Sequence, residues 1–419
     1  MMVRWLAAVL LAVAMPTTAA PLADIVAGRG RTAATPGIAG LAVVVADRRG
    51  VVRAEALGDA VIGQRPLTVD TPMRVASISK AVVAIGVMRL VEQGRLDLDG
   101  DVSKWLGWRL RNPAFREIKV TLRQLLSHTA GIDDAAGYRL PLGKSLQADM
   151  PAHWSAAAPG TRFSYANLNY GIVATVMEAV THQRFDRLMT ALVLAPLHLD
   201  AGYNWSGASD AAVARAAVLY RRGKDETAID PAGPWVAQVD DLAGKRPACP
   251  VATDGGCDLD RYVPGTNGTL FSPQGGLRIS ALGLATIGRM LLGDGVVDGV
   301  RLLKPASVRA LMTPVWREGQ GAADDTYKGE MRCYGAGLQC LSGEAGATDQ
   351  PVAGAKWWGH LGEAYGLLGG LWVDREHGRV LVYLITGTGD DPARAPHRSA
   401  FFGVEEALLQ ELAATPARR

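Results

Sequence analysis

The sequence predicts an α+β fold in which both chain ends form one antiparallel sheet, flanked by helices, around a large and mostly helical insertion. Two observations support this fold class. Apolar, strand-like runs occur near both ends, at 41–57 and 366–385, whereas helical patterns broken by glycine and proline dominate 121–199. Separation of strands from helices along the chain is typical of the α+β class. We therefore predict a sheet region built from 21–75 and 355–419.

The inserted region is predicted to span 76–354 and to include a long loop excursion at 207–274. This excursion is rich in Gly, Pro and Asp and is long for a connector, which is typical of a surface elaboration or of a loop that faces substrate. One helical piece is expected within it, at 211–220. The 419 residues are 48% hydrophobic, which is enough for a large core in a single catalytic unit.

The first 20 residues have the pattern of a secretory signal peptide. Arg4 supplies the positive charge, 5–15 is apolar, and 17–20 offers small residues for cleavage. The apolar run is too short to span a bilayer. We therefore predict an exported protein, periplasmic or secreted, with no stable membrane insertion after cleavage. An uncleaved N-terminal anchor is the alternative.

Composition also limits the partners. The net charge is +3 and no basic cluster is present, so no nucleic-acid partner is expected. We predict a monomer that acts on a small molecule or a peptide, with no cofactor and no metal. The acidic run at 94–101 begins like a calcium-binding loop, but it lacks the glycine and the later glutamate that such a loop needs.

Near the N-terminus, a short helix is expected at 22–31. The apolar run at 41–45, the turn at 47–50 and the partly alternating run at 51–57 predict a hairpin.

The next helix is predicted from Ser77 to about Gln93, with Ser77 in its first turn. Residues i and i+3 share a helix face, so the Lys80 ammonium can reach the Ser77 hydroxyl. The positive helix N-terminus and burial both lower the pKa of a lysine placed there. A serine beside such a base can act as a nucleophile. Taken alone, the pair also fits a capping serine with a solvent-exposed lysine.

Helices are then predicted at 122–126, 168–180, 185–194, 280–292 and 305–312. Beyond them, strands are expected at 366–373 and 379–385, with the turn 374–378 between them, and an amphipathic helix at 401–413 closes the chain. The apolar second strand is typical of one covered on both faces.

Four cysteines are present, and an even number in an exported chain favours disulfides. Three pairings are possible. We favour Cys249–Cys257 and Cys333–Cys340, two short links on glycine-rich loops. A zinc site needs tighter cysteine or histidine spacing than the chain offers.

Two further stretches combine polar groups with turns. Tyr165 and Asn167 precede a helix, and His360 and Gly362 open the C-terminal strand region. Each also has a plain structural interpretation: a packed tyrosine with a capping asparagine, and a histidine at a strand edge. The glycine permits close backbone approach.

Together, Ser77-x-x-Lys80, Tyr165-x-Asn167 and His360-x-Gly362 resemble the three-motif set of the serine β-lactamase and penicillin-binding-protein superfamily. Each motif occurs once, in the family's order. The flanking residues at 73–76, 125–131 and 275–277 match as well. The resemblance covers the chain after the signal segment. It is closest to the branch that holds class C β-lactamases, D-alanyl-D-alanine peptidases and esterases.

The resemblance implies an active site where the sheet meets the helical region. Ser77 is then the nucleophile, and Lys80 takes its proton or holds the site's hydrogen bonds. Tyr165 is the acid/base near the leaving group, its pKa lowered by neighbouring cations. Asn167 binds the substrate's amide carbonyl. Backbone N–H groups of Ser77 and Glu363 form the oxyanion hole. His128, in the loop before the second motif, is expected to be structural.

His360 and Gly362 are expected to help bind substrate. True β-lactamases of the family usually have lysine in place of His360, whereas His-x-Gly is more usual among peptidases and esterases. A histidine near neutral pH can be uncharged, unlike a lysine. The prediction is an exported serine hydrolase that forms an acyl-enzyme with an ester or a D-amino-acid peptide. The alternatives are a genuine class C-type β-lactamase and a penicillin-binding module with little turnover.

Overall fold

The computed structural model of the chain describes residues 21–28, 37–223, 230–251, 253, 256–389 and 399–416. The predicted signal peptide at 1–20 lies outside the described residues. Within those ranges, no helix is both long and apolar enough to cross a membrane.

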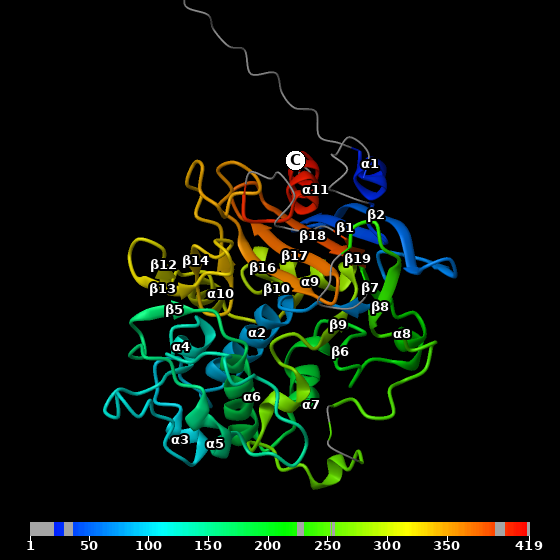
Figure 1. The fold of residues 1–419 in the computed structure, drawn as a ribbon. Coiled ribbons are helices and arrows are strands. Elements are labelled where there is room, and N and C mark those ends of the chain that lie inside the picture. The colour runs from blue at the N-terminus through cyan, green and yellow to red at the C-terminus, as the bar shows by residue number, and fades with distance from the viewer. Residues whose placement is uncertain are drawn as a thin grey trace, which may run out of the picture.

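A nine-stranded antiparallel sheet forms the upper half of the molecule in Figure 1, in the order β12-β14-β15-β16-β17-β18-β1-β2-β3. The two chain ends meet at its centre, where β1 pairs with β18. This confirms the predicted sheet. Its strands are β1 (Gly40–Asp47), β2 (Gly50–Val61), β3 (Arg65–Pro66), β12 (Trp316–Arg317), β14 (Cys333–Tyr334), β15 (Gln339–Cys340), β16 (Trp358–Ala364), β17 (Leu367–Asp374) and β18 (Arg379–Ile385).

The sheet reaches further back along the chain than predicted. Strands β12, β14 and β15 lie within 316–340, which the sequence interpretation assigned to the helical region. Each is two residues long, too short for the alternation by which strands are recognised. The predicted disulfides are confirmed: Cys333–Cys340 joins β14 to β15, and Cys249–Cys257 closes a loop of the excursion.

Helices cover both faces of the sheet (Figure 1). Alternate residues of β1 point to opposite faces. Leu41, Val43 and Val45 pack in the core that includes residues of α1 (Leu22–Ala27) and α11 (Gly403–Ala413). Their neighbours Ala42 and Val44 belong to the larger core, shared with α2 (Ile78–Glu92) and α9 (Ala281–Leu292). Because both faces are covered, β1 and β18 are fully buried apolar strands.

The helical half is built around α2, which runs beneath the sheet (Figure 1). Nearly the whole helix is buried, with Arg89, Val91 and Glu92 as its only less buried residues. Gly86 allows close packing here, because a Cβ would lie 2.7 Å from the Met189 sulfur. The remaining helices are α3 (Ser103–Leu106), α4 (Leu122–Leu126), α5 (Leu146–Asp149), α6 (Leu168–Thr181), α7 (Phe185–Met189), α8 (Asp210–Ala214) and α10 (Pro305–Leu311).

Small sheets tie the loop excursion to the core. The helix expected at 211–220 ends at Ala214, and its last residues instead join a strand, because they pair with β8 and β19. The short strands are β4 (Met73–Arg74), β5 (Arg162–Ser164), β6 (Gly202–Tyr203), β7 (Leu219–Arg222), β8 (Trp235–Val239), β9 (Leu277–Ile279), β10 (Val296–Val297), β11 (Val300–Arg301), β13 (Ala322–Asp325) and β19 (Gly387–Thr388).

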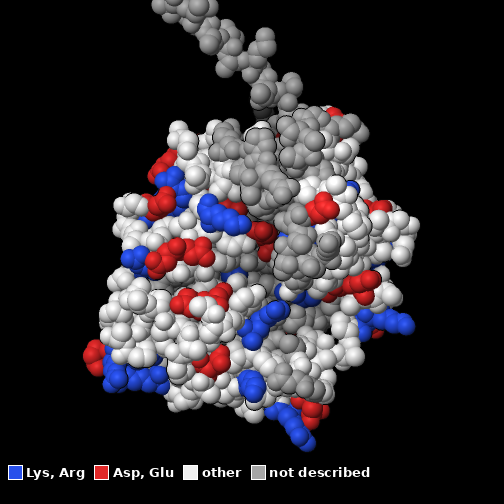
Figure 2. All heavy atoms as spheres, in the orientation of Figure 1, with Lys and Arg blue, Asp and Glu red and all other residues white. Residues whose placement is uncertain are grey.

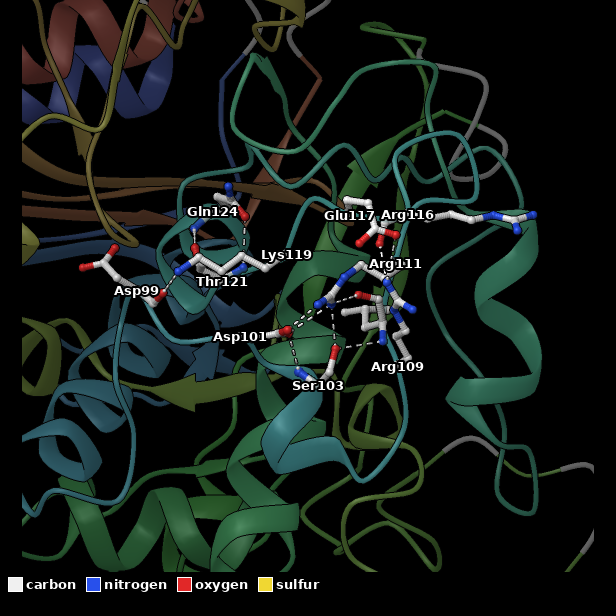
Figure 3. A network of polar contacts seen from close by, with 11 residues as sticks. Asp99, Asp101, Ser103, Arg109, Arg111, Arg116, Glu117, Lys119, Thr121 and Gln124 are labelled. Atoms are coloured by element: carbon white, nitrogen blue, oxygen red, sulfur yellow. Dashed lines mark hydrogen bonds and ion pairs between the residues drawn. The ribbon is translucent and has the colours of Figure 1, made fainter.

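The acidic run that resembled a calcium loop is held by arginines, and Figure 3 shows Arg111 next to Asp101. Asp99 pairs with the Arg123 guanidinium through two contacts of 2.7 Å. Asp101 accepts hydrogen bonds from Arg111 and from the backbone N–H of Ser103, the latter at 3.0 Å. Asp99 therefore links the loop between α2 and α3 to α4, and Asp101 links it to α3 and to the segment that follows α3.

Candidate active site

The first turn of α2 brings Ser77 and Lys80 into contact, as predicted. Lys80 Nζ lies 2.9 Å from Ser77 Oγ, 2.8 Å from Asn167 Oδ1 and 3.0 Å from the Gln274 carbonyl oxygen. The two carbonyl-type oxygens can only accept hydrogen bonds, whereas a hydroxyl can also donate. A neutral Lys80 amine therefore donates to Asn167 and Gln274 and keeps its lone pair for the Ser77 proton.

The surroundings of Lys80 favour this neutral amine. The side chain is fully buried, and burial lowers its pKa to about 7, while the charge of Asp134 acts in the opposite direction. Burial has this effect because the ammonium loses its hydration. Near neutral pH, a substantial fraction of the protein therefore carries a base next to the Ser77 hydroxyl.

A strained turn directs Ser77 towards the site. Ala76, between β4 and α2, has a φ of +44°, a conformation that non-glycine residues rarely adopt. No described residue accepts a hydrogen bond from the Ser77 backbone N–H. That N–H is therefore free to bind an oxyanion. Strain of this kind costs about 1–3 kcal/mol and concentrates at functional sites.

Tyr165 lies beside the pair, but its pKa differs from the prediction. Lys80 Nζ lies 4.9 Å from the centre of the tyrosine ring, over its face. Burial raises the pKa of Tyr165 well above its usual value, and the effect of the Ser77 hydroxyl in the other direction is smaller. The expected lowering by cations is therefore wrong for this state. Tyr165 is a protonated phenol, and its hydroxyl makes no well-formed hydrogen bond with the described residues.

Asn167 is held by a residue that the sequence interpretation missed. Asp134 accepts hydrogen bonds from the Asn167 backbone N–H at 2.7 Å, from its side-chain amide at 3.0 Å and from the Leu168 N–H at 3.0 Å. The amide is thereby fixed with its oxygen towards Lys80. Nothing in the sequence distinguishes Asp134 from the adjacent Asp133, since the contact arises only when its loop folds onto the start of α6.

His360 does not reach the cavity wall, contrary to the prediction that it helps bind substrate. Its ring is fully buried, with Nε2 2.7 Å from the Tyr334 hydroxyl and Nδ1 2.6 Å from the Leu361 carbonyl oxygen. The Leu361 carbonyl can only accept, so Nδ1 carries the proton and Nε2 accepts from Tyr334. Burial, followed by the charge of Lys80, lowers the pKa of His360 to about 3. The ring is therefore neutral and lies behind Tyr165, 6.3 Å between ring centres.

Gly362 has the structural role that its size permits. A Cβ at this position would lie 2.5 Å from the Val75 carbonyl oxygen, so β16 can lie against the turn before Ser77 only because the residue is glycine. The next residue, Glu363, lines the cavity together with Ser77. Its carboxylate accepts a hydrogen bond of 2.9 Å from the Tyr327 hydroxyl.

His128 packs beneath the site, in agreement with its expected structural role. Its ring centre lies 4.4 Å from that of Tyr165, and its Nδ1 accepts a 3.2 Å hydrogen bond from the Ala166 N–H. Burial is the largest cause that lowers its pKa well below the usual value. A neutral His128 therefore supports the turn that carries the second motif.

One cavity of about 350 Å³ brings together Ser77, Tyr165, Asn167 and Glu363. That volume is typical of a small-molecule site. The sequence interpretation missed several other residues that line this cavity, and these residues come from separate segments of the chain. These are Arg74, Tyr138, Arg139, Arg221, Tyr327 and Tyr365.

Asp134 gives a test of this geometry. Asp134→Ala leaves the donors of Asn167 without their acceptor, and we expect kcat to fall by roughly 10- to 100-fold. The carboxylate raises the pKa of Lys80, so its loss should move the low-pH limb of kcat/KM to lower pH. Asp133→Ala, at the preceding residue, is the matched control. A variant that loses activity without any shift of the pH profile would contradict a positioning role.

Comparison with known proteins places this geometry in context. The family model described as Beta-lactamase matches residues 22–402. Esterase EstB of Burkholderia gladioli is 34% identical over 207 residues, which cover 44% of this chain and 51% of the esterase. Protein Rv1367c of Mycobacterium tuberculosis (strain ATCC 25618 / H37Rv) is 27% identical over 281 residues, 59% of this chain and 60% of that protein. The matches thus span only about half of these relatives.

Solved structures share the fold over most of the chain. The octameric penicillin-binding protein homologue from Pyrococcus abyssi has a TM-score of 0.62 at 22% identity, covering 90% of this chain and 74% of that one. The D-stereospecific amidohydrolase from Streptomyces sp. has a TM-score of 0.57 at 21% identity, covering 90% and 94%. EstCE1, a hydrolase with promiscuous acyltransferase activity, has a TM-score of 0.62 at 23% identity, covering 88% and 93%.

Proposed function

The chain belongs to the beta-lactamase family, and we propose that it is a serine hydrolase that cleaves an ester or a D-amino-acid peptide through an acyl-enzyme on Ser77. The observation that carries the proposal is the 2.9 Å contact between Ser77 Oγ and the buried amine of Lys80. Esterase and amidase names among the similar proteins support the substrate class.

In the proposed acylation step, Ser77 Oγ attacks the substrate carbonyl while its proton moves to Lys80 Nζ. The negative charge on the carbonyl oxygen is held by the backbone N–H groups of Ser77 and Glu363, and losing one such donor typically costs about 3 kcal/mol. The leaving oxygen or nitrogen then takes a proton from the Tyr165 hydroxyl. Lys80 returns its own proton to Tyr165, which completes the transfer.

The high pKa of Tyr165 suits this order of events. A protonated phenol has a proton ready for the leaving group, whereas a tyrosinate has none. Deacylation reverses the sequence, with water in place of the leaving group and Lys80 as the base. Asn167, fixed by Asp134, offers its side-chain amide to the substrate next to the reacting bond.

Three substrates distinguish this function from its alternatives: p-nitrophenyl butyrate, an acyl-D-Ala-D-Ala peptide and penicillin G, each with wild type and Ser77→Ala. We expect turnover of the ester or the peptide in wild type only. Rapid penicillin hydrolysis without the other two activities would identify a β-lactamase instead. A stable penicillin adduct on Ser77 with no turnover of any substrate would identify a penicillin-binding module.

We also propose that the protein is exported. Its two disulfides support this, because such bonds persist in oxidising compartments and are rare in the cytosol. Cell fractionation with an antibody to the protein tests the proposal, and recovery in the cytosol with four free thiols would contradict it.

A further inference from the structure

Three arginines line the catalytic cavity without any carboxylate partner among the described residues: Arg74, Arg139 and Arg221. Elsewhere many arginines pair with a carboxylate or donate to backbone carbonyl groups, and Figure 2 shows Lys and Arg side chains next to Asp and Glu over much of the face in view. Even arginines far less buried than Arg74, such as Arg123 and Arg162, pair with acidic residues. The cavity departs from this pattern.

The strand register places Arg74 next to a second arginine instead of a carboxylate. Arg74 in β4 lies opposite Arg278 in β9, and like charges directly opposite are destabilising. Arg278 is compensated, because both oxygens of Asp240 accept from its guanidinium, at 3.1 and 3.0 Å. Arg74 has no such partner: it is nine-tenths buried, its Nε has no acceptor, and no described residue accepts from the rest of its guanidinium.

Tyr365 links Arg74 to the second arginine. The Arg74 guanidinium lies 4.8 Å from the centre of the Tyr365 ring, and Arg139 Nη1 lies 3.5 Å from the Tyr365 hydroxyl. Tyr365 has a φ of +58° in the turn between β16 and β17, where glycine or asparagine is preferred. The tyrosine therefore occupies an unfavourable backbone position and holds an aromatic surface between two cations.

The charges within the cavity do not cancel. Burial, followed by the charge of Arg278, lowers the pKa of Arg74 to about 10, with Arg139 acting in the same direction, so Arg74 is still protonated at neutral pH. Arg221, half-buried on β7, also has a buried Nε without an acceptor. Among the described residues of the wall, the one carboxylate is that of Glu363, which already accepts a hydrogen bond from Tyr327. A buried cation without a partner is costly, so an anion is expected to complete the group.

We infer that Arg74, Arg139 and Arg221 form a subsite for a carboxylate of the substrate. The inference rests on the proposed hydrolase function and adds a charge requirement to it, because Ser77 shares the same cavity of about 350 Å³. Arginine binds carboxylates through paired N–H donors. With Glu363 nearby, a singly charged carboxylate suits the cavity better than a doubly charged phosphate. The neutral, buried His360 supplies none of this charge.

A matched pair of inhibitors tests the subsite. N-acetyl-D-alanine carries a carboxylate, and N-acetyl-D-alaninamide replaces it with a neutral amide. Both are measured as competitors of p-nitrophenyl butyrate hydrolysis. We expect the acid to bind wild type roughly 10- to 100-fold more tightly than the amide. Added salt should weaken the acid only, because it screens charge.

Substitutions assign that preference to residues. Arg139→Gln, on an exposed loop, should reduce the acid-to-amide ratio by about tenfold. Arg74→Gln should do the same where it folds. Arg109→Gln removes an exposed arginine outside the cavity and should leave the ratio at its wild-type value. Equal binding of acid and amide to wild type, or a ratio unchanged in Arg139→Gln, would overturn the subsite.

The same measurement can be made without catalysis. Isothermal titration of the acid and the amide into Ser77→Ala reports binding alone, with the same expected ratio. An enzyme that hydrolyses no ester or peptide but still prefers the acid would refute the proposed function and keep the subsite. An active enzyme that binds the acid and the amide equally well would refute the subsite and keep the proposed function.

Discussion

Ser77→Ala is expected to lower kcat for the best ester or peptide substrate by roughly 10⁴- to 10⁶-fold, the range seen when a serine nucleophile is removed. The alanine has no oxygen to form the acyl bond, and Lys80 loses the hydroxyl that lies 2.9 Å from its amine. KM should change far less, because the arginines, Tyr165 and Asn167 stay in the cavity wall. Mass spectrometry of stopped reactions should find an acyl adduct in wild type and none in the variant.

Ser145→Ala is the matched control. Ser145 is an exposed residue before α5 and does not line the catalytic cavity. It should keep wild-type kcat and the acyl adduct. Thermal melting of both variants shows that each is folded. Substantial turnover by folded Ser77→Ala, above about one hundredth of wild type, would rule out Ser77 as the nucleophile.

The second large effect is expected from Lys80 and from pH. Only the neutral amine can take the Ser77 proton, and burial lowers the pKa of Lys80 to about 7. Below that pH the ammonium forms, so kcat/KM should fall about tenfold for each further pH unit. Above that pH, kcat/KM should no longer change with pH on account of Lys80. The profile is measured with a neutral ester, so that ionisation of the substrate does not contribute.

Substitution of Lys80 tests whether this residue acts as a base or only supplies a positive charge. Lys80→Arg keeps the charge, but a guanidinium does not lose its proton in proteins. We expect a loss of about 10³-fold or more, in keeping with the contribution of a general base. Exposed Lys144→Arg, before α5, is the control and should be fully active. A folded Lys80→Arg enzyme with near-normal kcat, or a wild-type profile that stays flat down to pH 5, would contradict this role.

The parts of the site that the sequence predicted are those fixed by local spacing. Ser77 and Lys80 are three positions apart on one helix, so their contact follows from helix geometry alone. The hairpin and the strand 379–385 were recognisable because their apolar runs are long. Cysteines seven and eight residues apart also close short loops without help from the rest of the fold.

The parts that the sequence could not predict depend on tertiary packing. The pKa of Tyr165 was expected to fall near cations, but burial raises it well above its usual value, and the opposing effect of the Ser77 hydroxyl is smaller. His360 was placed in the substrate site, whereas its side chain points to the buried face of β16, where Tyr334 is available as a partner. The roles of Asp134 and Arg74 cannot be read from their neighbours in the sequence. Asp134 acts through its contacts with Asn167 and Leu168, and Arg74 stands out because no other described segment supplies it with a carboxylate partner.

The pairing of β1 with β18 also has a kinetic consequence. The sheet centre joins residues from opposite ends of the chain, as in the pairing of Leu41 with Ile385. Contacts so distant in sequence form slowly, because a long loop must close before they contribute stability. We therefore expect α2 and the helices around it to collapse early, and the catalytic cleft to be completed late, when the C-terminal strands dock against β1.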